Sequence, residues 1–121
     1  MRIDVRCRVE MDGASLRDEA ERRVRVALGR FERRVRRVDV RFVDVNGPKG
    51  GPDHECRIEL RLSAPRRLIL VEEADAEPRA ALARATDRAA RIAARTIAQA
   101  HDDWQGGARR GAPPLRYEPR P

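Results

Sequence analysis

The chain has 121 residues, of which 40% are hydrophobic and 39% charged, so we expect a single domain whose apolar side chains gather on faces. Its net charge is +7, and Lys49 is the only lysine among 27 basic residues. This excess of arginine favours an RNA partner, because guanidinium groups bind phosphate in bidentate fashion. High arginine usage in a GC-rich genome is an alternative explanation. No stretch is long and apolar enough to span a membrane, and Met1 leads into strand-like sequence rather than a signal peptide, so we expect a cytoplasmic protein with no membrane contact.

The chain opens with a strand pattern followed by a helix pattern. Apolar and polar residues alternate from Arg2 to Val9, which predicts a half-buried strand. After a turn, Ser15 can cap a helix that runs to about Val35. The apolar stripe of this helix is Leu16, Ala20, Val24, Ala27, Leu28, Phe31 and Val35.

Three further strands are expected in succession. The second alternates around Val38, Val40 and Phe42 and ends at the glycine- and proline-rich segment 46–52. The third spans about residues 53–62, and the fourth about 67–73. The inward positions of the third strand are Cys56, Ile58, Leu60 and Leu62.

The two cysteines, Cys7 and Cys56, both fall on inward-facing strand positions. We therefore expect reduced core thiols rather than a disulfide or a zinc site, and neither a metal nor a cofactor.

A second, longer helix opens at Glu77-Pro78, since proline is well tolerated at a first helical position. Alanine-rich sequence continues it to about Ala100 or slightly beyond. Its predicted buried stripe is Leu82, Ala85, Ala89, Ile92, Ala93, Thr96, Ile97 and Ala100. After Asp103, glycines and prolines are expected to break any regular element, which predicts a domain over residues 1–103 and a basic, disordered tail over 104–121.

The order of elements is strand, helix, three strands, helix. Each strand is polar on one face, so both helices must cover the same side of the sheet. The sequence predicts an α+β fold with a four-stranded mixed sheet and two helices packed on one face, in a layout like that of double-stranded RNA-binding domains.

The strongest candidate for function is a row of arginines on the second helix: Arg84, Arg88, Arg91 and Arg95. Their spacing places them within an arc of roughly 60° on the side away from the core. Asp87 is the only acidic residue near them on the helix, so we expect a row without acidic partners that binds RNA phosphates, in preference to an ordinary solvated face.

Two weaker candidates accompany this row. The first helix carries Arg22, Arg25, Arg30 and Arg33, interspersed with carboxylates, and its arginine face would merge with that of the second helix if the two lie side by side. Lys49 lies among glycines but is followed by Gly50 and a strand rather than by a helix, which argues against a nucleotide-phosphate loop. It adds one cation to an RNA contact or belongs to a plain surface turn.

Catalysis has little support in the sequence. No serine or cysteine is paired with a histidine, and the carboxylates fall on charged strand faces or capping positions. We expect neither an enzyme nor a small-molecule substrate.

Several stretches, taken together, resemble the ribosome hibernation-promoting factor and ribosome-associated inhibitor family, also called sigma-54 modulation proteins. They are the opening residues 1–8, the segment 38–51, the strand 56–60, and residues 72–75 leading into an alanine-rich helix. The resemblance covers about residues 1–100. Where members often have Asp-Pro-Tyr-Ala-Ala, this chain has Glu77-Pro78-Arg79-Ala80-Ala81, and a tail of this length implies a short form without a C-terminal dimerisation domain.

The resemblance implies a stress-response protein that lies in the decoding region of the small ribosomal subunit, contacts its 16S-type rRNA with the arginine-bearing helices, and blocks messenger and transfer RNA. Off the ribosome we expect a monomer. Two alternatives stay open: a general binder of double-stranded RNA, and a protein-interaction module that regulates a polymerase factor.

Overall fold

The computed structural model describes residues 1–7, 13–44 and 54–110, with side chains described as far as residue 101. Its elements are β1 (Arg2–Cys7), α1 (Gly13–Leu28), the 3-10 helix η1 (Gly29–Arg34), β2 (Val35–Asp44), β3 (His54–Ser63), β4 (Arg66–Asp75) and α2 (Pro78–Arg110). Lys49 and residues 111–121 lie outside the described residues, so the expectations for the Lys49 turn and for most of the tail are not addressed by the structure.

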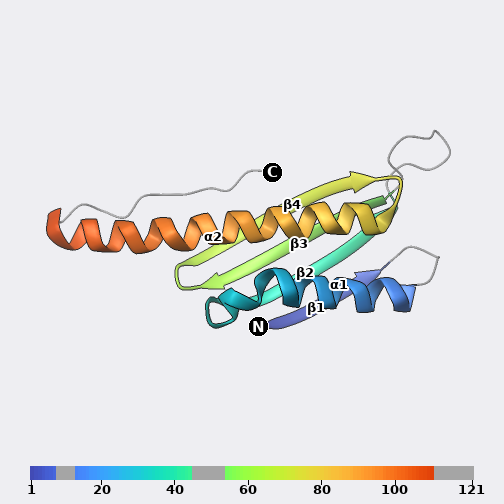
Figure 1. Cartoon of the computed structure of the whole chain (residues 1–121), viewed down its shortest axis with the longest axis horizontal. Helices are drawn as coiled ribbons and strands as arrows, with labels where there is room; N and C mark the ends of the chain where they lie inside the picture. Colours follow the sequence, from blue (N-terminus) through green and yellow to red (C-terminus); the bar gives the residue numbers. More distant parts are fainter. Residues whose placement is uncertain (8–12, 45–53, 111–121) are drawn as a thin grey trace.

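The four strands form one mixed sheet in the order β1-β2-β3-β4. β1 is parallel to β2, and the other neighbouring pairs are antiparallel. The parallel pair requires a crossover, which α1 and η1 supply. Both helices cover the same face of the sheet, with α1 over the β1 side and α2 over β3 and β4 (Figure 1). The predicted α+β architecture is confirmed.

The core lies between the helices and the inner face of the sheet. All four inward positions of β3, and Val38, Val40 and Phe42 of β2, are buried as predicted. From the helices, the buried positions include Leu16, Ala20, Val24, Leu28, Leu82, Ala85, Ala89, Ile92, Ala93 and Thr96. Burial of so much apolar surface, at roughly 25 cal/mol per Å², is the main favourable term for this fold.

The first helix ends earlier than its periodicity predicts. The α-helix stops at Leu28, η1 follows, and Val35 begins β2 rather than closing the helix. Gly29 stands at the change, where a residue of low helix propensity weakens the α-helical ladder. The register shift between Val35 and Arg37 then makes Arg36 an extra residue of β2 opposite β3.

The second helix ends later than predicted. α2 continues through Gly106 and Gly107 to Arg110, so the expectation that glycines would end regular structure after Asp103 is wrong for residues 104–110. A glycine costs a helix only about 1 kcal/mol, because it keeps its N–H group, whereas a proline lacks that group. The C-terminal part of α2 projects beyond the sheet (Figure 1). No helix in the described ranges is long and apolar enough to cross a membrane.

Candidate nucleic-acid interface

The predicted arginine row of α2 is divided into two unlike halves. Arg84, Arg91 and Arg95 are exposed, whereas Arg88 is half-buried. The division arises because the row lies along β4, whose last residues are acidic, for only part of its length.

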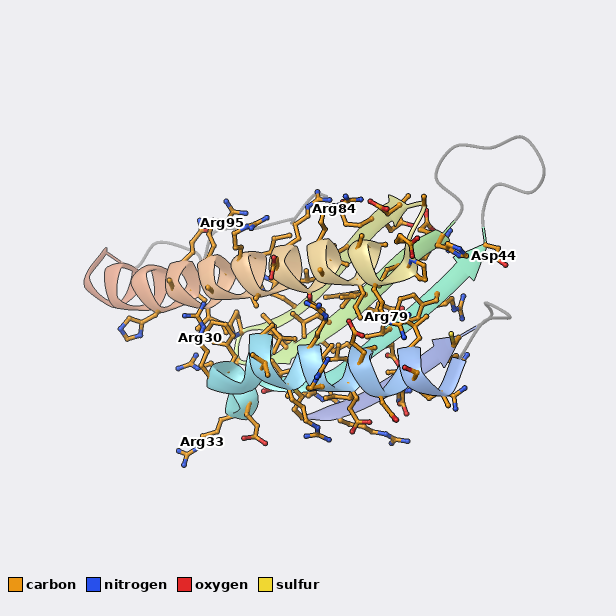
Figure 2. The ribbon with its side chains drawn as sticks, turned by 45° about the vertical axis from the view of Figure 1, so that its right-hand side comes forward. Arg30, Arg33, Asp44, Arg79, Arg84 and Arg95 are labelled. Carbon is orange, nitrogen blue, oxygen red and sulfur yellow. The ribbon has the colours of Figure 1, made fainter. Side chains whose placement is uncertain are left out.

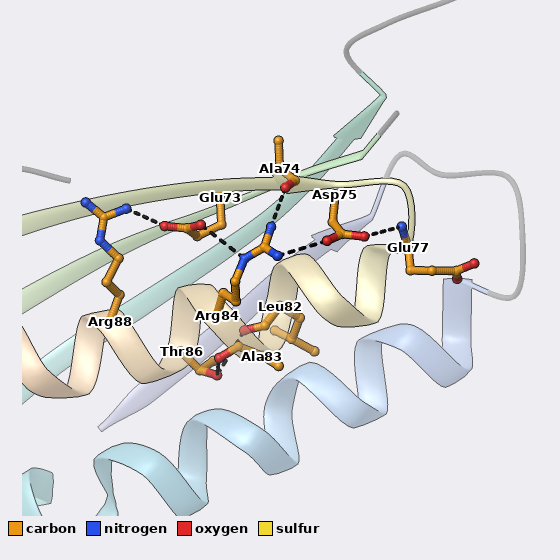
Figure 3. Close-up of polar contacts among 9 residues, drawn as sticks. All are labelled: Glu73, Ala74, Asp75, Glu77, Leu82, Ala83, Arg84, Thr86 and Arg88. Carbon is orange, nitrogen blue, oxygen red and sulfur yellow. Dashed lines mark hydrogen bonds and ion pairs between the residues drawn. The ribbon is translucent and has the colours of Figure 1, made fainter. Parts of the chain in front are cut away.

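Arg84 is held by three groups at the end of β4 (Figure 3). Its Nε lies 3.3 Å from Glu73 Oε1, and its Nη1 lies 2.9 Å from Asp75 Oδ2. Its Nη2 donates to the carbonyl oxygen of Ala74. Each of its three guanidinium nitrogens is therefore engaged within the domain.

Glu73 also holds Arg88, whose Nη1 contacts the second carboxylate oxygen, Glu73 Oε2. Asp75 also accepts a hydrogen bond from the backbone N–H of Glu77 at 3.0 Å, and this bond, together with Arg84, lowers the pKa of Asp75 below its ordinary value. Two carboxylates, Glu73 and Asp75, thus face the two arginines.

The expectation of a row without acidic partners is thus wrong for Arg84 and Arg88. Helix spacing identifies partners on the same helix, such as Asp87, but says nothing about carboxylates on a neighbouring strand. Glu73 faces α2 because it shares the inward alternation of Val71 on β4.

Arg91 and Arg95 form the available half of the row. Both are exposed, and neither has an ion pair within the described part of the chain. Four residues apart, they are separated by about 6 Å along the helix axis. Two neighbouring guanidinium groups without counterions are suited to phosphate oxygens.

The arginine faces of the two helices do not merge. Figure 2 shows Arg84 and Arg95 on the flank of α2 that faces away from α1. Arg30 lies on the other side of α2, and Arg33 points away from it (Figure 2). The single groove-lining surface expected for side-by-side helices is therefore replaced by two cationic surfaces on opposite flanks of α2.

The four arginines predicted on the first helix also differ from one another. Arg25 pairs with Glu21 at 2.9 Å, as helix spacing of four residues allows. Arg22 and Arg33 are exposed and have no ion pair among the described residues. Arg30 and Arg33 belong to η1, where Arg30 stacks 4.6 Å from the ring centroid of Phe31.

A shallow pocket of about 300 Å³ lies where η1 meets α2. Its lining is Gly29, Arg30, Phe31, Glu32, Arg33, Arg34 and Ile97. Arg34 fixes η1 to the β3–β4 turn by donating to the carbonyl oxygen of Ala64 at 3.0 Å. Three arginines beside an aromatic ring and an isoleucine offer both a charge for phosphate and an apolar surface for a base.

One arginine has a role that the sequence does not reveal. Arg79, at the position where the resembled family often has an aromatic residue, joins the two helices: its Nε lies 2.9 Å from Glu19 Oε1, and its Nη2 donates to Ser15 Oγ at 3.0 Å. Burial tends to raise the pKa of Glu19, but the bonds from Arg23 and Arg79 outweigh it and lower that pKa below its ordinary value. A polar bridge thus spans the gap between α1 and α2.

No protein-family model matches the chain, and no curated protein does. Among solved structures, the chain is similar to the N-terminal domain of Protein Y from Thermus thermophilus, with 29% sequence identity and a TM-score of 0.59. The match covers 79% of this chain and 99% of that one. Protein Y's domain is thus matched over almost its whole length, and it has the same α+β fold.

Proposed function

We propose that this protein binds the small ribosomal subunit at its decoding region, through 16S-type rRNA, and silences translation under stress by occupying the space of messenger and transfer RNA. The observation that carries the proposal is the match to the N-terminal domain of Protein Y from Thermus thermophilus. The sequence stretches that resemble the hibernation-promoting family support the same assignment.

The distribution of charge is compatible with this role. Arg95 lies on the flank of α2 that faces away from α1 (Figure 2), and Arg91 precedes it by about one helical turn. The η1 pocket with Arg30 and Arg33 includes Ile97 of the same helix. The opposite end of the domain holds Glu73 and Asp75, which neutralise Arg84 and Arg88. Among the described residues, unpaired cations thus lie around the middle of α2, and we propose that this part of the domain contacts the RNA.

The proposed mechanism is occupancy rather than catalysis. Arginine contacts to phosphates hold and orient a protein on structured RNA without reading its base sequence. A domain held in this way in the decoding region excludes messenger and transfer RNA by its volume. No bond is made or broken.

Co-sedimentation with purified small subunits over a salt series tests the proposal. We expect the wild type to sediment with the subunits, to be displaced by transfer RNA, and to lose affinity steeply with salt. The double variant Arg91→Glu, Arg95→Glu should bind at least about tenfold more weakly. The slope of its log affinity against log salt concentration should be shallower by roughly two, one for each lost phosphate contact.

The matched control compares two single charge reversals, Arg95→Glu and Arg17→Glu. Arg17 is exposed at the start of α1, far from the middle of α2, and has no ion pair among the described residues. We expect Arg95→Glu to weaken binding and Arg17→Glu to leave it nearly unchanged. A folded wild type that stays in the supernatant at low salt contradicts the proposal, and equal affinity for any RNA duplex indicates a general double-stranded RNA binder instead.

A further inference from the structure

The face of the sheet that no helix covers has its charges arranged in rows that cross the strands. In register across β1, β2, β3 and β4, the rows are Arg2-Arg37-Arg61-Leu68, Asp4-Asp39-Glu59-Leu70 and Arg6-Arg41-Arg57-Glu72. A cationic row, an anionic row and a second cationic row thus follow one another along the strands. These residues line most of an open groove of about 870 Å³ on this face.

The anionic row turns toward the first cationic row. Asp4 Oδ2 lies 2.7 Å from Arg37 Nη2 and 3.5 Å from Arg2 Nε. Asp39 lies 3.0 Å from Arg37 Nε. In the same way Glu59 lies 3.0 Å from Arg61. Three carboxylates therefore balance these three arginines.

The second cationic row is left without that balance. Arg57 is paired with Glu55 and lies 2.9 Å from Glu72. Arg6 and Arg41 are exposed, and neither has an ion pair or side-chain hydrogen bond within the described residues. They stand directly opposite each other on neighbouring strands, about 4.8 Å apart in the direction of the sheet hydrogen bonds.

Like charges directly opposite across two strands destabilise a sheet, and an anion bound between them removes that cost. Two guanidinium groups at strand spacing present paired N–H donors to tetrahedral oxyanions. The anionic row lies two residues further along the strands, about 6.7 Å away, and its carboxylates are already paired with the first cationic row. Among these three rows, the guanidinium groups left to bind an oxyanion are therefore those of Arg6 and Arg41.

We propose that Arg6 and Arg41 bind a phosphate group of an RNA backbone, as a second RNA contact on the face opposite the helices. This inference rests on the proposed function for its choice of RNA as the polyanion. In a channel walled by RNA on more than one side, the domain would then be held from both its helical and its sheet faces.

Arginine Nε–Hε signals in the NMR spectrum of the ¹⁵N-labelled full chain test this contact directly. The single variants Arg6→Gln and Arg41→Gln assign the two signals by removing one each. Addition of a short single-stranded RNA should shift both signals. Signals that do not move with RNA, or that move only with an oligoglutamate peptide, overturn the proposal.

Affinity provides the second measurement. The double variant Arg6→Gln, Arg41→Gln should bind the RNA oligonucleotide roughly threefold or more weakly than the wild type. The control Arg2→Gln, Arg61→Gln removes the same charge from paired arginines of the same face and should change affinity little. Equal losses in the two variants overturn the assignment to Arg6 and Arg41, and unchanged backbone amide spectra verify that both variants fold.

This experiment fails independently of the sedimentation experiment. A chain that sediments with small subunits but whose Arg6 and Arg41 signals ignore RNA contradicts the sheet-face contact alone. A chain whose two signals respond to RNA but which does not sediment with subunits contradicts the ribosome proposal alone.

Discussion

Arg84 and Glu73 join helix α2 to the edge strand β4, with Arg84 Nε 3.3 Å from Glu73 Oε1. Because the other oxygen of Glu73 contacts Arg88, one carboxylate of the strand contacts two of the four arginines in the row. The acidic end of β4 therefore limits which arginines of α2 are available to bind a ligand.

Replacing this carboxylate should release Arg88, whereas Arg84 keeps its contacts with Asp75 and the carbonyl oxygen of Ala74. We expect Glu73→Gln to increase affinity for RNA oligonucleotides severalfold and to steepen its salt dependence. We also expect it to lower the free energy of unfolding by about 1 kcal/mol, because hydrogen bonds to charged, partly exposed groups are lost. Fluorescence anisotropy and urea unfolding measure the two effects.

Asp18→Asn is the matched control, since it removes the same charge from an exposed residue of α1 that has no ion pair among the described residues. Equal gains in RNA affinity for the two variants would mean that total charge, rather than release of Arg88, is responsible.

Glu19 should make stability depend on pH. Burial raises its pKa, but the bonds from Arg23 and Arg79 lower the pKa by more than burial raises it. The folded pKa therefore lies below the ordinary value of 4.5. A carboxyl group with a depressed folded pKa stabilises the fold above its unfolded pKa and loses that contribution as pH falls through the folded pKa. We expect Glu19→Gln to be less stable than the wild type by about 1 kcal/mol at pH 7, with the difference shrinking as the pH falls below the ordinary value of 4.5 and through the lower folded pKa.

Urea unfolding at several pH values measures this difference. Glu21→Gln serves as the control, because the Glu21–Arg25 pair is about half exposed on both sides and should contribute only a few tenths of a kcal/mol. A Glu19→Gln deficit that is the same at pH 3 as at pH 7 would show that lost packing, and not the charge, destabilises the variant.

Cys56 should be unreactive in the folded protein. It is fully buried, and burial, reinforced by the charges of Glu55 and Glu73, raises its pKa to about 12. The thiolate is the reactive species, so in a Cys7→Ala variant we expect a thiol reagent at pH 8 to modify Cys56 only after addition of denaturant. Prompt modification under native conditions contradicts the buried position, and Cys56→Ala, which keeps the half-buried Cys7, provides the faster-reacting comparison.

The extension of α2 beyond Asp103 can be tested through its two glycines. Gly106→Ala with Gly107→Ala should raise the helical circular dichroism signal and stabilise the last turns by up to about 1 kcal/mol per substitution. Gly107→Pro should lower the helical signal, since proline removes a helical hydrogen bond. No difference between the alanine and proline variants would mean that the helix ends before these residues.

Alternation and helical spacing predict most of this fold. The inward positions of β3, from Cys56 to Leu62, and the stripe from Leu82 to Thr96 are buried as expected, because a residue's face depends on local geometry alone. The end of α1 at Leu28 and the continuation of α2 past Gly107 were not predicted, since both depend on small differences in helix propensity.

The candidate site is less predictable than the fold. The exposure of Arg91 and Arg95 follows from helical spacing, but the pairing of Arg84 with Glu73 and of Arg79 with Glu19 depends on which strand and which helix lie alongside. The opposition of Arg6 and Arg41 depends on strand register, which tertiary packing sets and a single strand's pattern does not. Residue spacing within one helix or strand therefore does not predict contacts between different elements.

The helix α2 is longer than the sheet on which it packs. Its 33 residues correspond to a rod of about 50 Å, whereas the ten-residue strand β4 is about 33 Å long. The end of the helix at Arg110 therefore stands well outside the outline of the sheet, at a distance and in a direction that the helix itself fixes. Because this end lies far from the sheet, a tilt of the helix by a few degrees at the sheet moves the end at Arg110 by several ångströms.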